Sequence, residues 1–314
     1  MSVARRYLAL LIVLLCLLPL FFIDVGSVRV IRSELLLFGH IGFFAALAYV
    51  ATRILRETPI GLGWQVGAVM LAALALGAAI ELLQPLYDRS LNLRDIWQNQ
   101  LGAAFGLVLA HPERLLRARW TLPLLALLTV EAYRPAMVLW SERVAAARFP
   151  LLSDFEHHLD RQRWNKGLVV TGVARSGDRS LQVELLPGEP WPGTRLLRGL
   201  GDWSGYDHFH VSVFNPDTES IRLTVAIRDQ EHHGRGNRYG DRFNGHYTLQ
   251  PGWNDLTIPV AEIIAAPRER LLDVARLESV MLYTPKVDAR RLLYVDAVYL
   301  GQKTEGRREA PNRG

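Results

Sequence analysis

A series of long apolar runs, all within the first 140 residues, constrains this chain more than any other feature. They cover residues 7–23, 35–54, 62–83, 96–110 and 122–140. Crossing the hydrocarbon core of a bilayer takes about 20 mostly apolar residues, with a lower limit near 17. We therefore predict an all-α polytopic membrane domain with about five transmembrane helices.

Charged residues accompany the first and the fifth run. Residues 7–23 follow two arginines, as in a signal peptide, but no small-x-small cleavage pattern comes after them. We interpret this run as a retained helix. The fifth run contains Glu131 and Arg134, which are three residues apart and share a helix face. Pairing between them would lower the cost of keeping both charges in a membrane.

The pattern changes after residue 150. Apolar and polar side chains alternate in several short segments, at 209–213, 221–227, 256–258, 280–282 and 293–295. This alternation indicates half-buried β-strands, and turn signals such as Pro251-Gly252 lie between them. We expect an all-β antiparallel sandwich.

These observations define four expected parts of the chain. They are a membrane domain at 1–120, a fifth helix and linker at 121–150, the sandwich at 151–301 and a disordered tail at 302–314.

The charge balance fits a membrane protein better than a nucleic-acid-binding protein. The 314 residues have a formal net charge of +5 and no lysine-rich patch. Loops that would be cytoplasmic with a cytoplasmic N-terminus hold the excess of arginines, as the positive-inside rule requires. Five spans would then place the sandwich outside the cytoplasm, at a bacterial inner membrane. The single cysteine, Cys16, excludes a disulfide within one chain.

One polar stretch, residues 81–99, interrupts the apolar runs. Glu81 and Gln84 are three residues apart and share a helix face, while Pro85 should end that helix. Asp95 and Asn99 share a face of the next helix. Acids and amides at the rim of a membrane are costly to keep there, so their default interpretation is a functional site.

The predicted topology brings six polar residues to the same depth, at the outer rim of the membrane: His40, Glu81, Gln84, Arg89, Asp95 and Asn99. Gly102 and Gly106 form a small-x-x-x-small pair that would let their helix pack closely against a neighbour. The polar groups could then face one cavity. An internal network that holds the helix ends together is the structural alternative.

The order Glu-x-x-Gln, Arg, Asp-x-x-x-Asn-x-x-Gly, preceded by His40, resembles the VanZ-like membrane domain over about residues 1–120. The resemblance implies a helical membrane fold and a connection with glycopeptide-antibiotic tolerance. Over about 152–301, segments such as GDRSLQVEL and LLYVDAVYL resemble the jelly-roll carbohydrate-binding modules with a galactose-binding-like fold.

The second resemblance implies a sugar site and a structural calcium. Aromatic and polar residues suited to a glycan are Trp191, Trp203, Tyr239, Arg242 and His246. Any of the tryptophans could instead belong to the core. Oxygen donors at the positions that correspond to a calcium site are Asp154, Glu156 and Asp296, which is only part of the six to eight oxygens that calcium takes.

Three functions remain open at this level. The first is binding of an envelope glycan or lipid-linked head group at the membrane surface. The second is an enzyme that acts on a lipid-linked or peptidoglycan precursor, with Glu81, Asp95 or His40 as acid–base groups. The third is a scaffold without a small ligand. The sequence contains no metal motif, nucleophile elbow or phosphate loop that would favour the enzyme.

Overall fold

The computed structural model describes residue 12 and residues 29–87, 92–112 and 114–302. The chain divides into two compact units, Met1–Val138 and Leu139–Gly314. We expected boundaries near residues 120 and 150. A single helix, α5 (Arg114–Arg148), passes through the first of these positions and ends just before the second, so most of the expected linker is helical.

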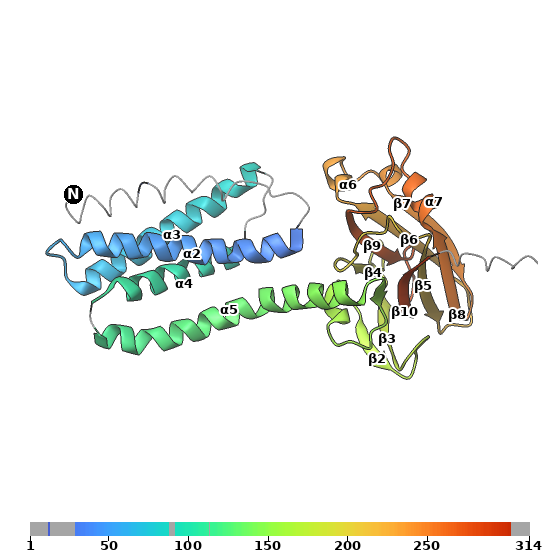
Figure 1. Ribbon diagram of the computed structural model, residues 1–314, viewed down its shortest axis with the longest axis horizontal. Helices are drawn as coiled ribbons and strands as arrows, with labels where there is room; N and C mark the ends of the chain where they lie inside the picture. The colour runs from blue at the N-terminus through green and yellow to red at the C-terminus, as the bar shows by residue number, and fades with distance from the viewer. Residues whose placement is uncertain (1–11, 13–28, 88–91, 113, 303–314) are drawn as a thin grey trace, which may run out of the picture. The chain divides into compact units, whose positions relative to one another are not determined.

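The first unit is helical. Its elements are α2 (Arg29–Leu55), α3 (Leu62–Leu83), the short 3-10 helix η2 (Gln84–Tyr87), α4 (Leu93–Ala110) and the first part of α5. Figure 1 shows α2, α3 and α4 running alongside one another. Helix α3 ends two residues before Pro85, as expected because proline lacks an amide donor and crowds the preceding turn.

Two glycines bring α4 against α2. A Cβ atom at Gly102 would overlap with the carbonyl oxygen of Ile41, and one at Gly106 would overlap with that of Ala45. Neither position has room for a side chain. The predicted close packing of this small-x-x-x-small pair is confirmed, and its neighbour is α2.

Two helical segments in the described residues are long and apolar enough to cross a membrane, Leu62–Leu86 and Arg117–Arg148. The described part of the chain thus supports two candidate spans and not about five. Residues 7–23, apart from residue 12, lie outside the described residues. The apolar part of α2, Gly39–Leu55, is short, and the first half of α4 contains two charges and three amides.

The second unit is a β-sandwich with short helices in its loops. Its strands are β1 (Leu151–Ser153), β2 (Leu168–Thr171), β3 (Arg179–Leu185), β4 (Gly193–Leu196), β5 (His208–Asn215), β6 (Ile221–Asp229), β7 (Phe243–Leu249), β8 (Gly252–Pro259), β9 (Leu277–Tyr283) and β10 (Arg291–Gly301). Its helical turns are η3 (Asp160–Arg163), α6 (Glu231–Gly234), η4 (Tyr239–Asp241) and α7 (Val260–Ala265).

The strands form two antiparallel sheets (Figure 1). One has the order β2-β3-β10-β5-β8 with β1 beside β10, and the other has the order β4-β9-β6-β7. All five segments with period-two alternation lie in strands, so the antiparallel sandwich is confirmed. Apolar residues that point between the sheets form the core, as Val225 on β6 and Val213 on β5 illustrate, both fully buried.

Candidate functional sites

The first candidate site is a cluster of buried polar side chains in the helical unit. His40 on α2 contacts two residues of α4. Its Nδ1 atom lies 2.9 Å from Oδ1 of Asn99, and its Nε2 atom lies 3.7 Å from Oδ2 of Asp95. Asn99 fits between the helices because Gly77 on α3 leaves room, since a Cβ atom there would lie 2.7 Å from Nδ2 of Asn99.

Asn92 connects this group to α3. Its side chain caps α4 by accepting the amide of Arg94, and its Nδ2 atom donates to Asp95 over 2.8 Å. Its backbone amide donates to Oε2 of Glu81 over 2.8 Å. Asn92 therefore links Glu81 to Asp95, which in turn contacts His40.

Gln84 lies close in the chain and is fully buried. Within the described residues, neither of its amide atoms has a hydrogen-bond partner. The sixth predicted residue, Arg89, lies outside the described residues. The structure therefore brings His40, Glu81, Asp95 and Asn99 into contact, directly or through Asn92. Gln84, three residues after Glu81, is buried as well.

Glu131 on α5 belongs to a neighbouring group of polar contacts. We expected it to pair with Arg134. Instead its carboxylate accepts from Arg94 at 2.9 Å, Trp97 at 3.2 Å and Gln98 at 3.0 Å. The expected pair is on one helix, whereas the actual partners come from α4. An acid that faces another helix is satisfied across the interface.

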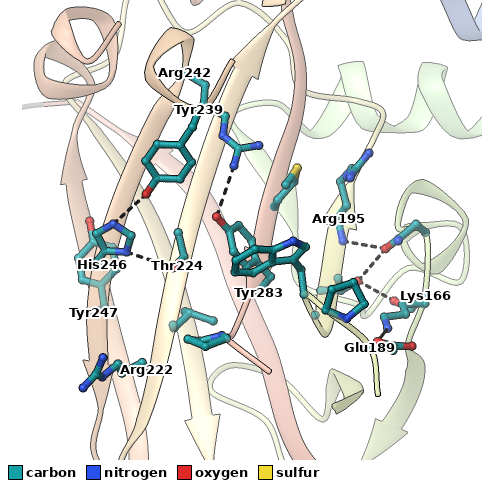
Figure 2. Close-up of a pocket in the computed structure, with 18 of the residues that line it drawn as sticks. Lys166, Glu189, Arg195, Arg222, Thr224, Tyr239, Arg242, His246, Tyr247 and Tyr283 are labelled. Atoms are coloured by element: carbon teal, nitrogen blue, oxygen red, sulfur yellow. Dashed lines mark hydrogen bonds and ion pairs between the residues drawn. The ribbon is translucent and has the colours of Figure 1, made fainter. Parts of the chain in front are cut away.

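The second candidate site is a groove of about 1060 Å³ on the outer face of the four-stranded sheet, shown in Figure 2. Strand register explains its floor, because residues opposite each other on antiparallel strands face the same side. The central row consists of Gly193 on β4, Tyr283 on β9, Thr224 on β6 and His246 on β7. Only glycine fits at the end of the row, since a Cβ atom at Gly193 would overlap with the backbone of β9.

Exposed aromatic rings stand on both sides of this floor. Trp191, in the loop before β4, is 67% exposed and packs edge-to-face with Tyr283 at 5.7 Å between ring centres. Tyr239, at the start of η4, is 57% exposed. The guanidinium of Arg242 lies 5.4 Å from the centre of the Tyr239 ring and restrains it by a cation–π contact.

Hydrogen bonds hold the polar groups of the floor in place (Figure 2). His246 lies between Thr224 and the Tyr239 hydroxyl, with 3.1 Å to each. The guanidinium of Arg242 donates to the hydroxyl of Tyr283 over 3.4 Å. Burial raises the pKa of Tyr283 above its ordinary value.

Arg270 holds the loop that carries Tyr239. Its guanidinium donates to Asp229 at 2.8 Å and to Asp241 at 2.7 Å, and His232 lies 3.2 Å from the Asp241 carboxylate. The hydrogen bond from Arg270 lowers the pKa of Asp241. Burial alone would raise the pKa of Asp229, but hydrogen bonds with Arg270 and with the backbone hold it below its ordinary value.

Four of the five residues that we predicted for glycan binding line the groove: Trp191, Tyr239, Arg242 and His246. The interpretation of Trp203 as a fifth is wrong. Its side chain is fully buried, stacks on Phe209 at 5.0 Å and donates its indole N–H to the carbonyl of Leu200. A tryptophan that is fully buried, with its indole N–H already bonded in the core, cannot contact a ligand in the groove.

The residues expected to hold calcium are used in other contacts. Asp154 pairs with Arg148 at 2.5 Å. Glu156 accepts two backbone amides at 2.8 Å each, and Asp296 accepts amides at 2.6 and 3.0 Å. Within the described residues, no group of three His, Cys, Asp or Glu side chains is placed to hold a metal ion. The calcium prediction finds no support in the described residues, where N–H donors already bind at least one oxygen of each of the three carboxylates.

The sequence does not identify several residues that line the groove, notably Lys166, Arg195, Arg222, Thr224 and Tyr283. Alternation along β6 does place Arg222 and Thr224 on the polar face. Nothing local shows that this face meets Tyr283, because that contact depends on which strands pair.

No family model matches the chain, and no curated protein matches it. Solved structures similar to it overlap about half of its length. A family 11 carbohydrate-binding module from Clostridium thermocellum, in complex with a β-1,3-1,4-mixed-linked tetrasaccharide, is 18% identical over 48% of this chain and 94% of that one, with a TM-score of 0.36. A family 28 module specific for non-crystalline cellulose is 15% identical over 49% and 95%, with a TM-score of 0.35. An exo-β-agarase is 11% identical over 49% and 25%, with a TM-score of 0.39.

Proposed function

We propose that this chain is an integral membrane protein whose β-sandwich binds a glycan of the bacterial cell envelope. The observation that carries the proposal is the groove, in which Trp191 and Tyr239 expose their rings on either side of hydrogen-bonded polar groups. Aromatic rings stack on the apolar faces of sugars, while fixed polar groups select the hydroxyls. A volume of about 1060 Å³ suits an oligosaccharide better than a single sugar.

The membrane part of the proposal rests on where the apolar side chains lie. In the most apolar 18-residue window of Leu62–Leu86, only 28% of the residues are buried. In the corresponding window of Arg117–Arg148, 17% are buried. The core helix of a soluble protein would be mostly buried, and large exposed apolar faces signal an interaction surface. Lipid is the partner that suits them. We retain a cytoplasmic N-terminus, an extracytoplasmic sandwich and a VanZ-like helical unit as parts of this proposal.

Glycan binding is tested with the full chain in detergent, titrated with neutral and charged oligosaccharides in a calorimeter. Trp191→Ala should weaken binding at least tenfold, because a stacked aromatic anchor contributes about 2 kcal/mol. The matched control is Tyr299→Ala, which removes an exposed ring from the other sheet and should leave affinity unchanged. Equal affinity of Trp191→Ala and the parent chain would refute the groove as the site.

The side of the membrane is tested separately. A reporter that works only outside the cytoplasm is fused after Gly301 and read in intact cells. Activity is expected. A silent reporter, with an active cytoplasmic counterpart at the same position, would place the sandwich inside and remove the envelope glycan from consideration.

A second candidate function is acid–base catalysis on a lipid-linked precursor. The observation in its favour is the contact of His40 with Asp95 and Asn99 in a buried cluster that also includes Glu81. Cells that express the chain can be compared for tolerance to a glycopeptide antibiotic. Loss of tolerance with Glu81→Gln but not with Trp191→Ala would favour the enzyme, since the substitution keeps the shape and removes the acid. The reverse pattern would favour the binding protein.

A further inference from the structure

The groove contains more positive charge than a neutral sugar requires. Its lining has four cationic side chains, Lys166, Arg195, Arg222 and Arg242, and one acid, Glu189. The ammonium of Lys166 pairs with that acid at 2.6 Å. The pair cancels itself, so the three arginines set the charge of the lining.

The three arginines differ in how many interaction partners they have within the protein. Arg242 donates to Asn244 and Tyr283 and lies against the ring of Tyr239. The guanidinium groups of Arg195 and Arg222 have no carboxylate partner within the described residues. In Figure 2 they lie on two sides of Tyr283. Unneutralised guanidinium groups that flank an aromatic floor are suited to an anion on a ring-shaped ligand.

A smaller hollow continues this positive character. Its volume is about 580 Å³, and it is lined by Arg235, Arg238 and Arg268 together with Asp241 and Glu269. Arg270 already neutralises the Asp241 carboxylate, and Arg235 pairs with Glu231 at 3.5 Å. Arg238 and Arg268 then face one acid of the lining, Glu269, so a small positive excess remains. Tyr239 of the groove lies in the chain between Arg238 and Gly240 of this hollow. One loop therefore borders both surfaces.

We propose that the groove selects an anionic glycan, a chain of sugar rings with carboxylate or phosphate groups. Its rings stack on Trp191 and Tyr239, and its acid groups pair with Arg195 and Arg222. Guanidinium pairs bidentately with either oxyanion. A longer chain reaches the arginines of the smaller hollow. This inference rests on the proposed glycan binding and adds the chemical class of the ligand.

The test compares acidic and neutral tetrasaccharides of matched length on the full chain in detergent. The acidic probes are tetragalacturonic and tetramannuronic acid, and the neutral probes are cellotetraose and mannotetraose. We expect at least one acidic probe to bind tenfold tighter than both neutral ones. Its affinity should fall as salt rises from 50 to 500 mM, because added ions screen exposed charges.

Charge-removing variants locate the effect. Arg195→Gln and Arg222→Gln should each weaken the acidic probe about tenfold, the equivalent of one charge-assisted hydrogen bond, and should affect the acidic probe more than the neutral probes. Arg179→Gln is the matched control, since it removes one exposed charge from β3 of the other sheet. Arg238→Gln should weaken acidic hexasaccharides more than acidic tetrasaccharides.

The outcomes separate this inference from the proposed function. Neutral probes that bind as tightly as acidic ones, with no effect of either glutamine variant, would overturn the anionic preference and leave glycan binding in place. Absence of binding by any probe would overturn both. Displacement of the acidic probe by inorganic phosphate at millimolar concentration would support glycans that bear phosphate groups. If phosphate does not displace the probe, phosphate-bearing glycans are ruled out and the ligand is restricted to carboxylated glycans.

Discussion

The polar cluster of the helical unit and the groove of the sandwich differ in how far their side chains are exposed. Glu81 and Asn99 are fully buried among apolar helices, whereas Trp191 and Tyr239 in the groove are 67% and 57% exposed. Buried polar groups must satisfy one another, since each unpaired group costs about 1–3 kcal/mol. Groove residues are free to meet a ligand. Substitutions should therefore damage stability in the first region and affinity in the second.

The largest effect is expected from Gly106→Ala. Its new Cβ atom would overlap with the backbone of α2, so the helices must separate, at about 3 kcal/mol. The control is Gly67→Ala, where no atom lies within 4 Å and a stabilisation of up to about 1 kcal/mol is expected. Unfolding of the detergent-solubilised chain in SDS measures both. Equal stability of the two variants would contradict the close α2–α4 contact.

Arg270→Gln should have an effect of similar size on stability, and it should lower affinity as well, unlike the other substitutions. It leaves the buried Asp229 without its cationic partner, which costs about 3 kcal/mol. It also frees the loop with Tyr239, so glycan affinity should fall as well. Thermal unfolding and calorimetric titration of one preparation test both. The exposed pair of Arg276 and Asp273 supplies the control, because Arg276→Gln should change neither quantity appreciably.

Acid should destabilise the sandwich through carboxylates whose pKa is lowered in the folded state. The hydrogen bond with Arg175 holds the pKa of Asp255 at about 2, and Asp229 and Asp241 are also lowered. Groups of this kind stabilise the fold above their unfolded pKa of about 3.9 and lose that contribution as pH falls through the folded pKa. Melting temperatures should therefore drop between pH 4 and pH 2.

Asp255→Asn should flatten this decline only slightly, because its ion pair is about half exposed and contributes at most about 1 kcal/mol. A melting temperature that rises as the pH falls below 4 would contradict the lowered pKa values of these carboxylates.

The smallest stability effect is expected from Trp191→Ala, within about 0.5 kcal/mol, as for other surface substitutions. The same variant should lose most of the glycan affinity. A loss of several kcal/mol in unfolding experiments would mean that Trp191 supports the fold, and the contrast between the two regions would then fail.

Much of the local structure follows from the sequence. Period-two alternation located five strands, proline marked the end of α3, and two glycines indicated close helix packing. These signals depend on neighbours within a few residues, so they can be read without the fold. The same reasoning selected four of the groove residues by their chemistry, and it could not tell that Trp203 belongs to the core.

Only the tertiary structure decided which distant residues meet. Gly193, Tyr283, Thr224 and His246 form one row because β4, β9, β6 and β7 pair in a given register. Glu131 binds Arg94 on another helix and not Arg134 on its own. By itself the sequence determined the two kinds of structure and the candidate chemistry. The groove required strand order and register, because these long-range pairings depend on packing of the whole sandwich and leave no local pattern.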